Sequence, residues 1–256
     1  MENAPPLPVP VAEIPEAEIV RLVTRYRKAG GPVMHIVNLF GTRVESQIEK
    51  LPDSIKDRIE RVVETALHRC YTLAGRILGE GDTLGESGHR TVALLTGAVG
   101  GFGGLPSAVA ELPVTVTVIF RAIQKIAESY GYDPADPEVR LECLQVFGAG
   151  SPLHEDDGVN TSFLGARVTM TGPALNRVIA AVAPRLSLVL GEKLAAQTVP
   201  LLGSVAGAGV NYAFLSYYQE MAHVRFGLMK LAETHDRAAL LETFRAIAAG
   251  ERVGKS

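Results

Sequence analysis

Cysteine is scarce in this chain, with only Cys70 and Cys143 among 256 residues. Neither belongs to a Cys-x-x-Cys pair, so the sequence excludes a disulfide framework and a cysteine-based zinc site. Each cysteine falls within an apolar pattern of helical spacing, where a free thiol acts as a small core residue. We therefore expect a reduced, cytosolic chain with two buried thiols.

The sequence also lacks a block of basic residues and has a formal net charge of only −3. A nucleic-acid-binding surface is therefore not expected. The N-terminus, MENAPPLPVPVAEIPEAE, has neither the positive flank nor the apolar run of a signal peptide. We interpret residues 1–13 as a flexible proline-rich arm and 251–256 as a C-terminal tail.

Hydrophobic residues are abundant, at 47% of the chain, so a sizeable core is available. Apolar residues recur at helical spacing over most of the sequence. The predicted helices cover 14–29, 32–50, 54–77, 113–130, 136–147, 161–183, 184–198, a segment that ends near 232, and 236–249. With no internal linker, the pattern predicts one all-α domain over 14–250. We expect a bundle of about 8–10 helices, with two glycine-rich apolar helical segments at its centre.

The run VTVTVIF after Pro113 alternates like a strand, but it leads directly into the helical pattern RAIQKIAESYG. Proline is favoured in the first turn of a helix, where its missing N–H costs nothing. We therefore predict that a helix begins at Pro113 and ends near Tyr130.

The stretch GAVGGFGGLPSAVAELP, residues 97–113, contains five glycines but has neither the spacing nor the βαβ context of a nucleotide-binding loop. Its glycines recur four residues apart, as do two glycines in the later apolar run, so each pair shares one helix face. We predict close helix packing there, or alternatively a helix break before Pro106. The packing residues are Gly97, Gly101, Gly104, Gly203 and Gly207.

Two uncharged segments, 91–110 and 194–219, are long enough to span a bilayer. The first is rich in Gly, Thr, Ser and Pro, and the second is interrupted by Pro200 and carries Gln197 and Asn211. We therefore favour a buried helical hairpin, or one that docks on a membrane surface, over a spanning helix.

Glu111 is the only charged residue between 91 and 120. If a helix begins at Pro113, Glu111 precedes its N-terminus, where the helix dipole favours a carboxylate. Glu111 is then either a cap or ion-pair partner of Arg121 or Arg167, or a buried acid that acts as a general base or ligand anchor.

Polar residues in the second apolar segment also fall into stripes. One stripe consists of Tyr212, Ser216, Gln219 and His223, and the neighbouring one consists of Asn211, Tyr218 and Arg225. This face is either solvated or an interface, or it forms the wall of a polar pocket with His223 as a candidate acid or base.

Metal and serine-hydrolase motifs are weak. The six histidines are scattered, no His-Glu-x-x-His occurs, and we interpret LHEDDG at 153–158 as a solvated acidic loop rather than a cation site. No Gly-x-Ser-x-Gly elbow is present. We expect no metal and no cofactor.

Several motifs together resemble the EcsC family. They are the glycines at 100–104, Glu111-Leu112-Pro113, Arg121-Ala122-Ile123, YGYD at 130–133, Pro137-Glu138, and the C-terminal pattern VPLLGSVAGAGVNYAFLSYYQEMAHVRFGLMKL. Glu111 stands where the family often has aspartate, and a tyrosine expected near Phe163 is missing, although Arg167 remains. The resemblance implies a bacterial, α-helical protein that is cytoplasmic or peripheral to the inner membrane, and it implies no activity.

Three hypotheses follow. The leading one is a binding module for an apolar or lipid-like ligand, or one that docks on a membrane surface or a membrane-protein partner, with Arg121, Arg167, Asn211, Tyr212, Gln219 and Arg225 as candidate binding residues. The second is a hydrolase that joins Glu111 and His223 in one cleft with Arg121, Arg167 and Asn211. The third is a homo-oligomeric scaffold with Gly97, Gly101, Gly203 and Gly207 at the subunit contact.

Overall fold

The structure is a computed structural model that describes residues 14–29, 53–77, 104–149, 174–197 and 203–250. These residues form seven α-helices and one short 3-10 helix, with no strand among them. The elements are α1 (Glu16–Ala29), α4 (Asp53–Ile77), α6 (Gly104–Ser129), α7 (Pro137–Val146), η1 (Phe147–Ala149), α9 (Ala174–Gln197), α10 (Gly203–Leu231) and α11 (Arg237–Ala248). The predicted all-α fold is confirmed.

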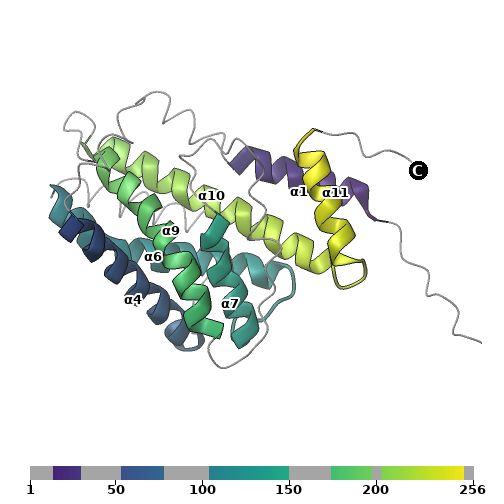
Figure 1. The fold of residues 1–256 in the computed structure, drawn as a ribbon, viewed down its shortest axis with the longest axis horizontal. Helices are drawn as coiled ribbons and strands as arrows, with labels where there is room; N and C mark the ends of the chain where they lie inside the picture. The colour runs from purple at the N-terminus through teal and green to yellow at the C-terminus, as the bar shows by residue number, and fades with distance from the viewer. Residues whose placement is uncertain (1–13, 30–52, 78–103, 150–173, 198–202, 251–256) are drawn as a thin grey trace, which may run out of the picture.

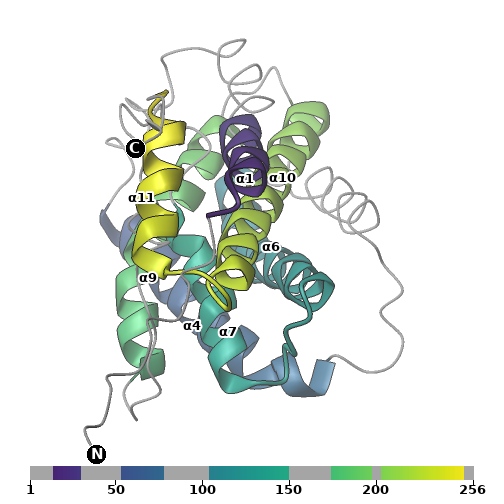
Figure 2. The same ribbon diagram turned by 90° about the vertical axis from the view of Figure 1, so that its right-hand side faces the viewer.

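Helix α10 crosses the molecule and contacts most of the other helices (Figure 1). The N-terminal α1 and the C-terminal α11 pack together at one end of α10. On the other side α4 packs against both α6 and α9, and α7 lies against α6 and α9 (Figure 2). The two terminal helices thus cover one part of α10, and the middle of the chain covers another.

A row of aromatic rings connects the middle helices to α10. Phe120 of α6 stacks on Phe147 of η1 with ring centroids 6.4 Å apart, and Phe147 lies 5.3 Å from Tyr218 of α10. The three side chains are at most 2% exposed. Tyr217 also donates its hydroxyl to the Ala149 carbonyl at 3.0 Å. Aromatic burial of this kind is a dominant part of core stability.

Helix starts are well marked in the sequence. The side chain of Asp136 accepts the Glu138 N–H at the start of α7, and that of Asp236 accepts the Ala239 N–H at the start of α11. Side-chain oxygens before the first turn satisfy N–H groups that the helix leaves unpaired. The predictions for 14–29, 54–77, 136–147 and 236–249 agree with the structure, whereas 32–50 lies outside the described residues.

The predicted helix start at Pro113 is wrong. Helix α6 begins at Gly104, which puts Pro106 in its first turn and Pro113 in its interior. An interior proline removes one backbone hydrogen bond, but burial of Leu112, Val116 and Ile119 on one face offsets that loss. Glu111 is therefore inside a helix, and the interpretation that it caps a helix N-terminus is also wrong.

The predicted boundary between residues 183 and 184 is wrong for the same reason. Helix α9 runs without interruption from Ala174 to Gln197, with Pro184 inside it. Ala183, Leu186 and Leu190, around the proline, are all buried, so packing holds the helix together across it. The predicted segment 161–173 lies outside the described residues.

The predicted glycine packing falls mostly beyond what the structure describes. Gly97 and Gly101 lie outside the described residues, Gly104 and Gly203 are the first residues of α6 and α10, and Gly207 lies in α10. A close helix approach does occur at another glycine. A Cβ atom at Gly227 of α10 would lie 2.6 Å from Leu22 Cδ2 of α1.

The two segments that raise the membrane-spanning alternative are described only in part, because 91–103 and 198–202 lie outside the described residues. Among the described helices, none combines the length and apolar character that crossing a bilayer requires.

Candidate functional site

The turn between α6 and α7 positions two tyrosines against α10. Gly131 adopts a positive φ of 87°, its N–H bonds the Glu128 carbonyl, and the Tyr132 N–H bonds the Ala127 carbonyl. This is the Schellman arrangement, in which glycine takes the left-handed position after a helix. As a result, the Tyr130 hydroxyl lies 3.3 Å from His223 Nδ1, and the Tyr132 ring packs against the ring of Phe226.

The same segment then starts α7. Asp133 accepts the Ala135 N–H, and Asp136 caps the helix whose first residue is Pro137. Glu138 follows in the first turn, where the helix dipole favours a negative charge. The residues YGYDPADPE therefore form a rigid corner that presents one tyrosine and two carboxylates near the end of α10.

A buried ion pair joins α7 to α10. Arg225 donates from Nε to Glu142 Oε2 at 2.7 Å, and from a terminal nitrogen to the same oxygen and to Gln145 Oε1. Arg225 is 1% exposed and Glu142 is 8% exposed. Burial lowers the pKa of Arg225, whereas the Glu142 carboxylate opposes that shift by stabilising the charged guanidinium.

Glu142 also lines a groove between α7 and the corner formed by the end of α10 and the start of α11. The groove has a volume of about 450 Å³. Its lining consists of Tyr132, Asp136, Glu138, Val139, Glu142, Met229, Ala232, Glu233 and Arg237. Carboxylates and one guanidinium thus surround a short apolar strip of Val139, Met229 and Ala232.

The lining is rich in carboxylates: Asp136, Glu138, Glu142 and Glu233 share it with one cation, Arg237. Two of these carboxylates are paired with a cation, Glu142 with Arg225 and Glu233 with Lys230. Glu138 is exposed in the first turn of α7. The groove thus combines a short apolar strip with a largely acidic lining.

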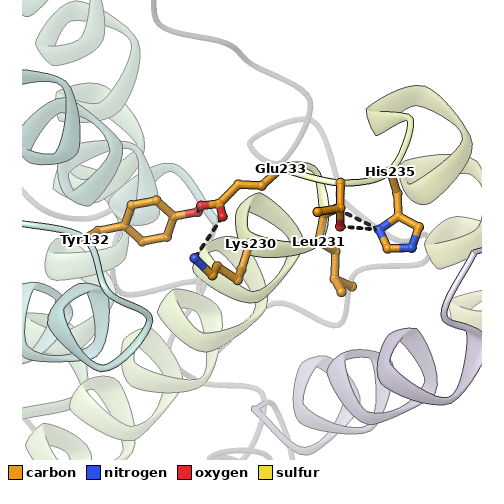
Figure 3. Close-up of polar contacts among 6 residues, drawn as sticks. Tyr132, Lys230, Leu231, Glu233 and His235 are labelled. Carbon is orange, nitrogen blue, oxygen red and sulfur yellow. Dashed lines mark hydrogen bonds and ion pairs between the residues drawn. The ribbon is translucent and has the colours of Figure 1, made fainter. Parts of the chain in front are cut away.

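A second polar cluster forms the wall of the groove at Glu233 (Figure 3). Tyr132 donates its hydroxyl to Glu233 Oε1 at 2.9 Å, and Lys230 Nζ lies 2.8 Å from Glu233 Oε2. The hydrogen bonds from Lys230 and Tyr132 lower the pKa of Glu233. Burial, and then the Glu233 carboxylate, raise the pKa of Tyr132, so its hydroxyl stays protonated and acts as a donor.

Among the predicted site residues, those on α10 are the best described. Gln219 is fully buried, His223 is 8% exposed and Tyr212 is half-buried. Arg225 belongs to the ion pair with Glu142, and His223 contacts Tyr130. The stripe that contains Gln219 and His223 is therefore packed against other helices, and neither residue lines the groove.

The remaining predicted residues are not brought together by anything the structure describes. Arg121 of α6 is half-buried and close enough to Cys70 of α4 for its charge to lower the pKa of that thiol. The larger and opposite effect of burial raises the pKa of Cys70 to about 11. Glu111 and Asn211 lie in α6 and α10, but their side chains are outside the description, as is the whole of Arg167. Their roles stay predictions.

The sequence interpretation missed most of the groove. Tyr132 and Glu138 belong to the family-like motifs but are not among the candidate site residues, and Glu142 belongs to neither group. A signal was present in RLECLQ, residues 140–145, because a carboxylate between Leu141 and Cys143 in a short apolar helix needs a partner. The sequence does not show which residue is that partner, because Arg225 is far from Glu142 along the chain.

In the described ranges no group of three or more His, Cys, Asp or Glu side chains is arranged to hold a metal ion. The acidic segment 153–158 lies outside those ranges.

Comparison with known proteins identifies a family for this chain. The model of the EcsC protein family matches residues 33–228, so α1 and α11 lie outside the matched range. The chain is 26% identical over 193 residues to "Uncharacterized protein YdbA" of Bacillus subtilis (strain 168). That alignment covers 72% of this chain and 66% of YdbA, slightly less than two thirds of the relative's length. No solved structure matches the chain.

Proposed function

The chain belongs to the EcsC protein family, and we propose that it is a helical binding module that takes a lipid-like amphiphile in the groove between α7 and the α10–α11 corner. The observation that carries the proposal is the groove itself. It combines an apolar strip with charged groups in a volume of about 450 Å³. Small-molecule sites are concavities of roughly 300–1,000 Å³ that combine apolar walls with a few polar groups, and this groove falls in that size range with a larger share of charged residues.

The packing beneath the groove also supports a preformed site. The pair of Arg225 and Glu142 fixes α7 against α10, and the Schellman turn at Gly131 fixes the start of α7. A site held by such contacts loses little freedom when a ligand binds, and that loss is a major cost of binding. Met229 and Ala232 then supply apolar contact to a ligand chain.

Methyl NMR on protein labelled at the methionine methyl groups tests the proposal. Met229 lines the groove, whereas Met221, two turns earlier on α10, is fully buried. Titration with n-octylammonium or octyl glucoside below their micelle concentrations should shift the Met229 signal in a saturable manner. The Met221 signal serves as the internal control and should stay in place. The variant Met229→Leu assigns the signal.

Two outcomes would overturn the proposal. One is the absence of a saturable shift at Met229 with either amphiphile. The other is an equal shift of Met221 and Met229, which indicates general loosening of the bundle. Flotation with liposomes of phosphatidylethanolamine and phosphatidylglycerol adds a further arm. Flotation without any response of Met229 would favour membrane docking through another surface.

A further inference from the structure

The ammonium group of Lys230 lies between a carboxylate and an aromatic ring, an arrangement that also suits an organic ammonium ion. The Lys230 Nζ atom lies 2.8 Å from Glu233 Oε2 and 5.9 Å from the centre of the Tyr132 ring (Figure 3). A carboxylate beside an aromatic face attracts an ammonium group both as an ion pair and through the ring quadrupole. The Tyr132 hydroxyl also bonds the second oxygen of Glu233 at 2.9 Å, which holds ring and carboxylate in one unit.

Tyr132 and Glu233 face the groove, but Lys230 does not line it. The lysine reaches the unit from α10, three residues before Glu233, and its side chain is 52% exposed. Exposed pairs at this spacing are weak, because both partners are well solvated when apart. Lys230 can therefore move into water at little cost and leave the ring and carboxylate to another cation.

We propose that Tyr132 and Glu233 form a binding site for the ammonium group of the amphiphile, and that Lys230 is a tethered competitor for that site. This inference rests on the proposed function and adds the charge of the ligand's head group to it. Asp136 and Glu138, at the start of α7, contribute further carboxylates to the same groove, which also contains one cation, Arg237. An ammonium at Glu233 leaves the attached chain within the groove that contains Val139 and Met229.

The competition predicts a gain of affinity on removing the lysine. Lys230→Met keeps an apolar side chain of similar length and removes the ammonium. We expect it to strengthen n-octylammonium binding by about threefold or more, the range of a cation–π contact at an exposed site. Glu233→Gln should weaken binding of the same probe by a similar factor, because it removes the counter-charge. Octyl glucoside, with the same chain and no charge, should bind equally to the wild type and both variants.

A matched control exists on α6. Lys125 pairs with Glu128 at 2.9 Å with the same three-residue spacing, and neither residue lines the groove. Lys125→Met changes the net charge by the same amount as Lys230→Met. It should leave the affinity for n-octylammonium unchanged if the effect is local rather than a response to overall charge.

Titration calorimetry measures the affinity of the wild type and the three variants for n-octylammonium and for octyl glucoside. The ammonium site is wrong if Lys230→Met does not increase n-octylammonium affinity, or if Lys125→Met increases it equally. It is also wrong if octyl glucoside shows the same changes. In each of these cases a saturable response of Met229 leaves the groove function standing. Absence of binding by both probes to every protein overturns both proposals.

Discussion

Arg225 and Glu142 come from helices far apart in the chain and meet at 2.7 Å beneath the groove. The two residues are 1% and 8% exposed, respectively, so both charges are largely removed from water. Burial of one ion without the other is costly, whereas a hydrogen-bonded pair is tolerated. The pair therefore fixes the position of α7 on α10 and, with it, one wall of the groove.

Glu142→Ala should destabilise the protein strongly, because it leaves the Arg225 guanidinium buried without its counter-charge. Removing one partner of a buried pair costs about 3–5 kcal/mol. Urea unfolding measures the loss. Glu138→Ala on the same helix is the control and should cost less than about 1 kcal/mol, since Glu138 is exposed.

The double variant Arg225→Met with Glu142→Leu distinguishes charge from packing. Replacing a buried pair by apolar side chains of similar volume is often close to neutral. We therefore expect it to be more stable than Glu142→Ala alone. A double variant that is less stable would show that the side chains are required for their shape or for the bond to Gln145.

Gly227→Ala tests the close contact between α10 and α1. A helical alanine gains about 1 kcal/mol over glycine, but here its Cβ atom would lie 2.6 Å from Leu22 Cδ2. Overpacking costs roughly 1–3 kcal/mol, so the single variant should range from neutral to about 2 kcal/mol less stable. In a Leu22→Ala background the same substitution should be stabilising. Equal effects of Gly227→Ala in the two backgrounds would contradict the predicted contact.

Cys70 gives a pH dependence with a definite sign. Burial raises the pKa of its thiol from an ordinary 9.0 to about 11, so the unfolded chain loses this proton first. The contribution is fully present below pH 9 and is lost as the pH rises toward 11. At pH 10 the loss of stability from this thiol amounts to roughly 1 kcal/mol. Urea unfolding at pH 8 and pH 10 should show a smaller fall in stability for Cys70→Ala than for the wild type. An identical fall in both proteins would exclude a role of this thiol.

The contact between the terminal helices is testable by a double-mutant cycle. The rings of Tyr26 in α1 and Phe244 in α11 lie 5.8 Å apart in an edge-to-face arrangement. Phe244→Ala alone should cost about 3–5 kcal/mol, because the side chain is fully buried. The cycle with Tyr26→Ala should give a coupling of about 0.5–1.5 kcal/mol. No coupling would mean that the ring contact does not contribute to the packing of α1 against α11.

Local sequence determined much of this fold. Apolar periodicity, the carboxylates Asp136 and Asp236 before helix starts, and the glycine at 131 are short-range signals, since each acts within about one helical turn of its own position. The predicted helices at 14–29, 54–77, 136–147 and 236–249 therefore agree with the structure. The two failures, at Pro113 and Pro184, occur where the core overrides a local signal. An interior proline costs one hydrogen bond, and burial of residues on both sides of it offsets that cost.

The groove forms only through tertiary packing. Its residues come from the α6–α7 corner and from the α10–α11 corner, and no spacing in the sequence connects Glu142 to Arg225 or Tyr132 to Glu233. The sequence indicates Arg225 as a candidate binding residue because it shares a polar helical stripe with Asn211 and Tyr218. Which carboxylate pairs with Arg225 depends on which helix packs against α10. That packing is set by the shape of the whole core, so the ion pair, the groove above it and the ammonium site at its wall appear only once the helices are assembled.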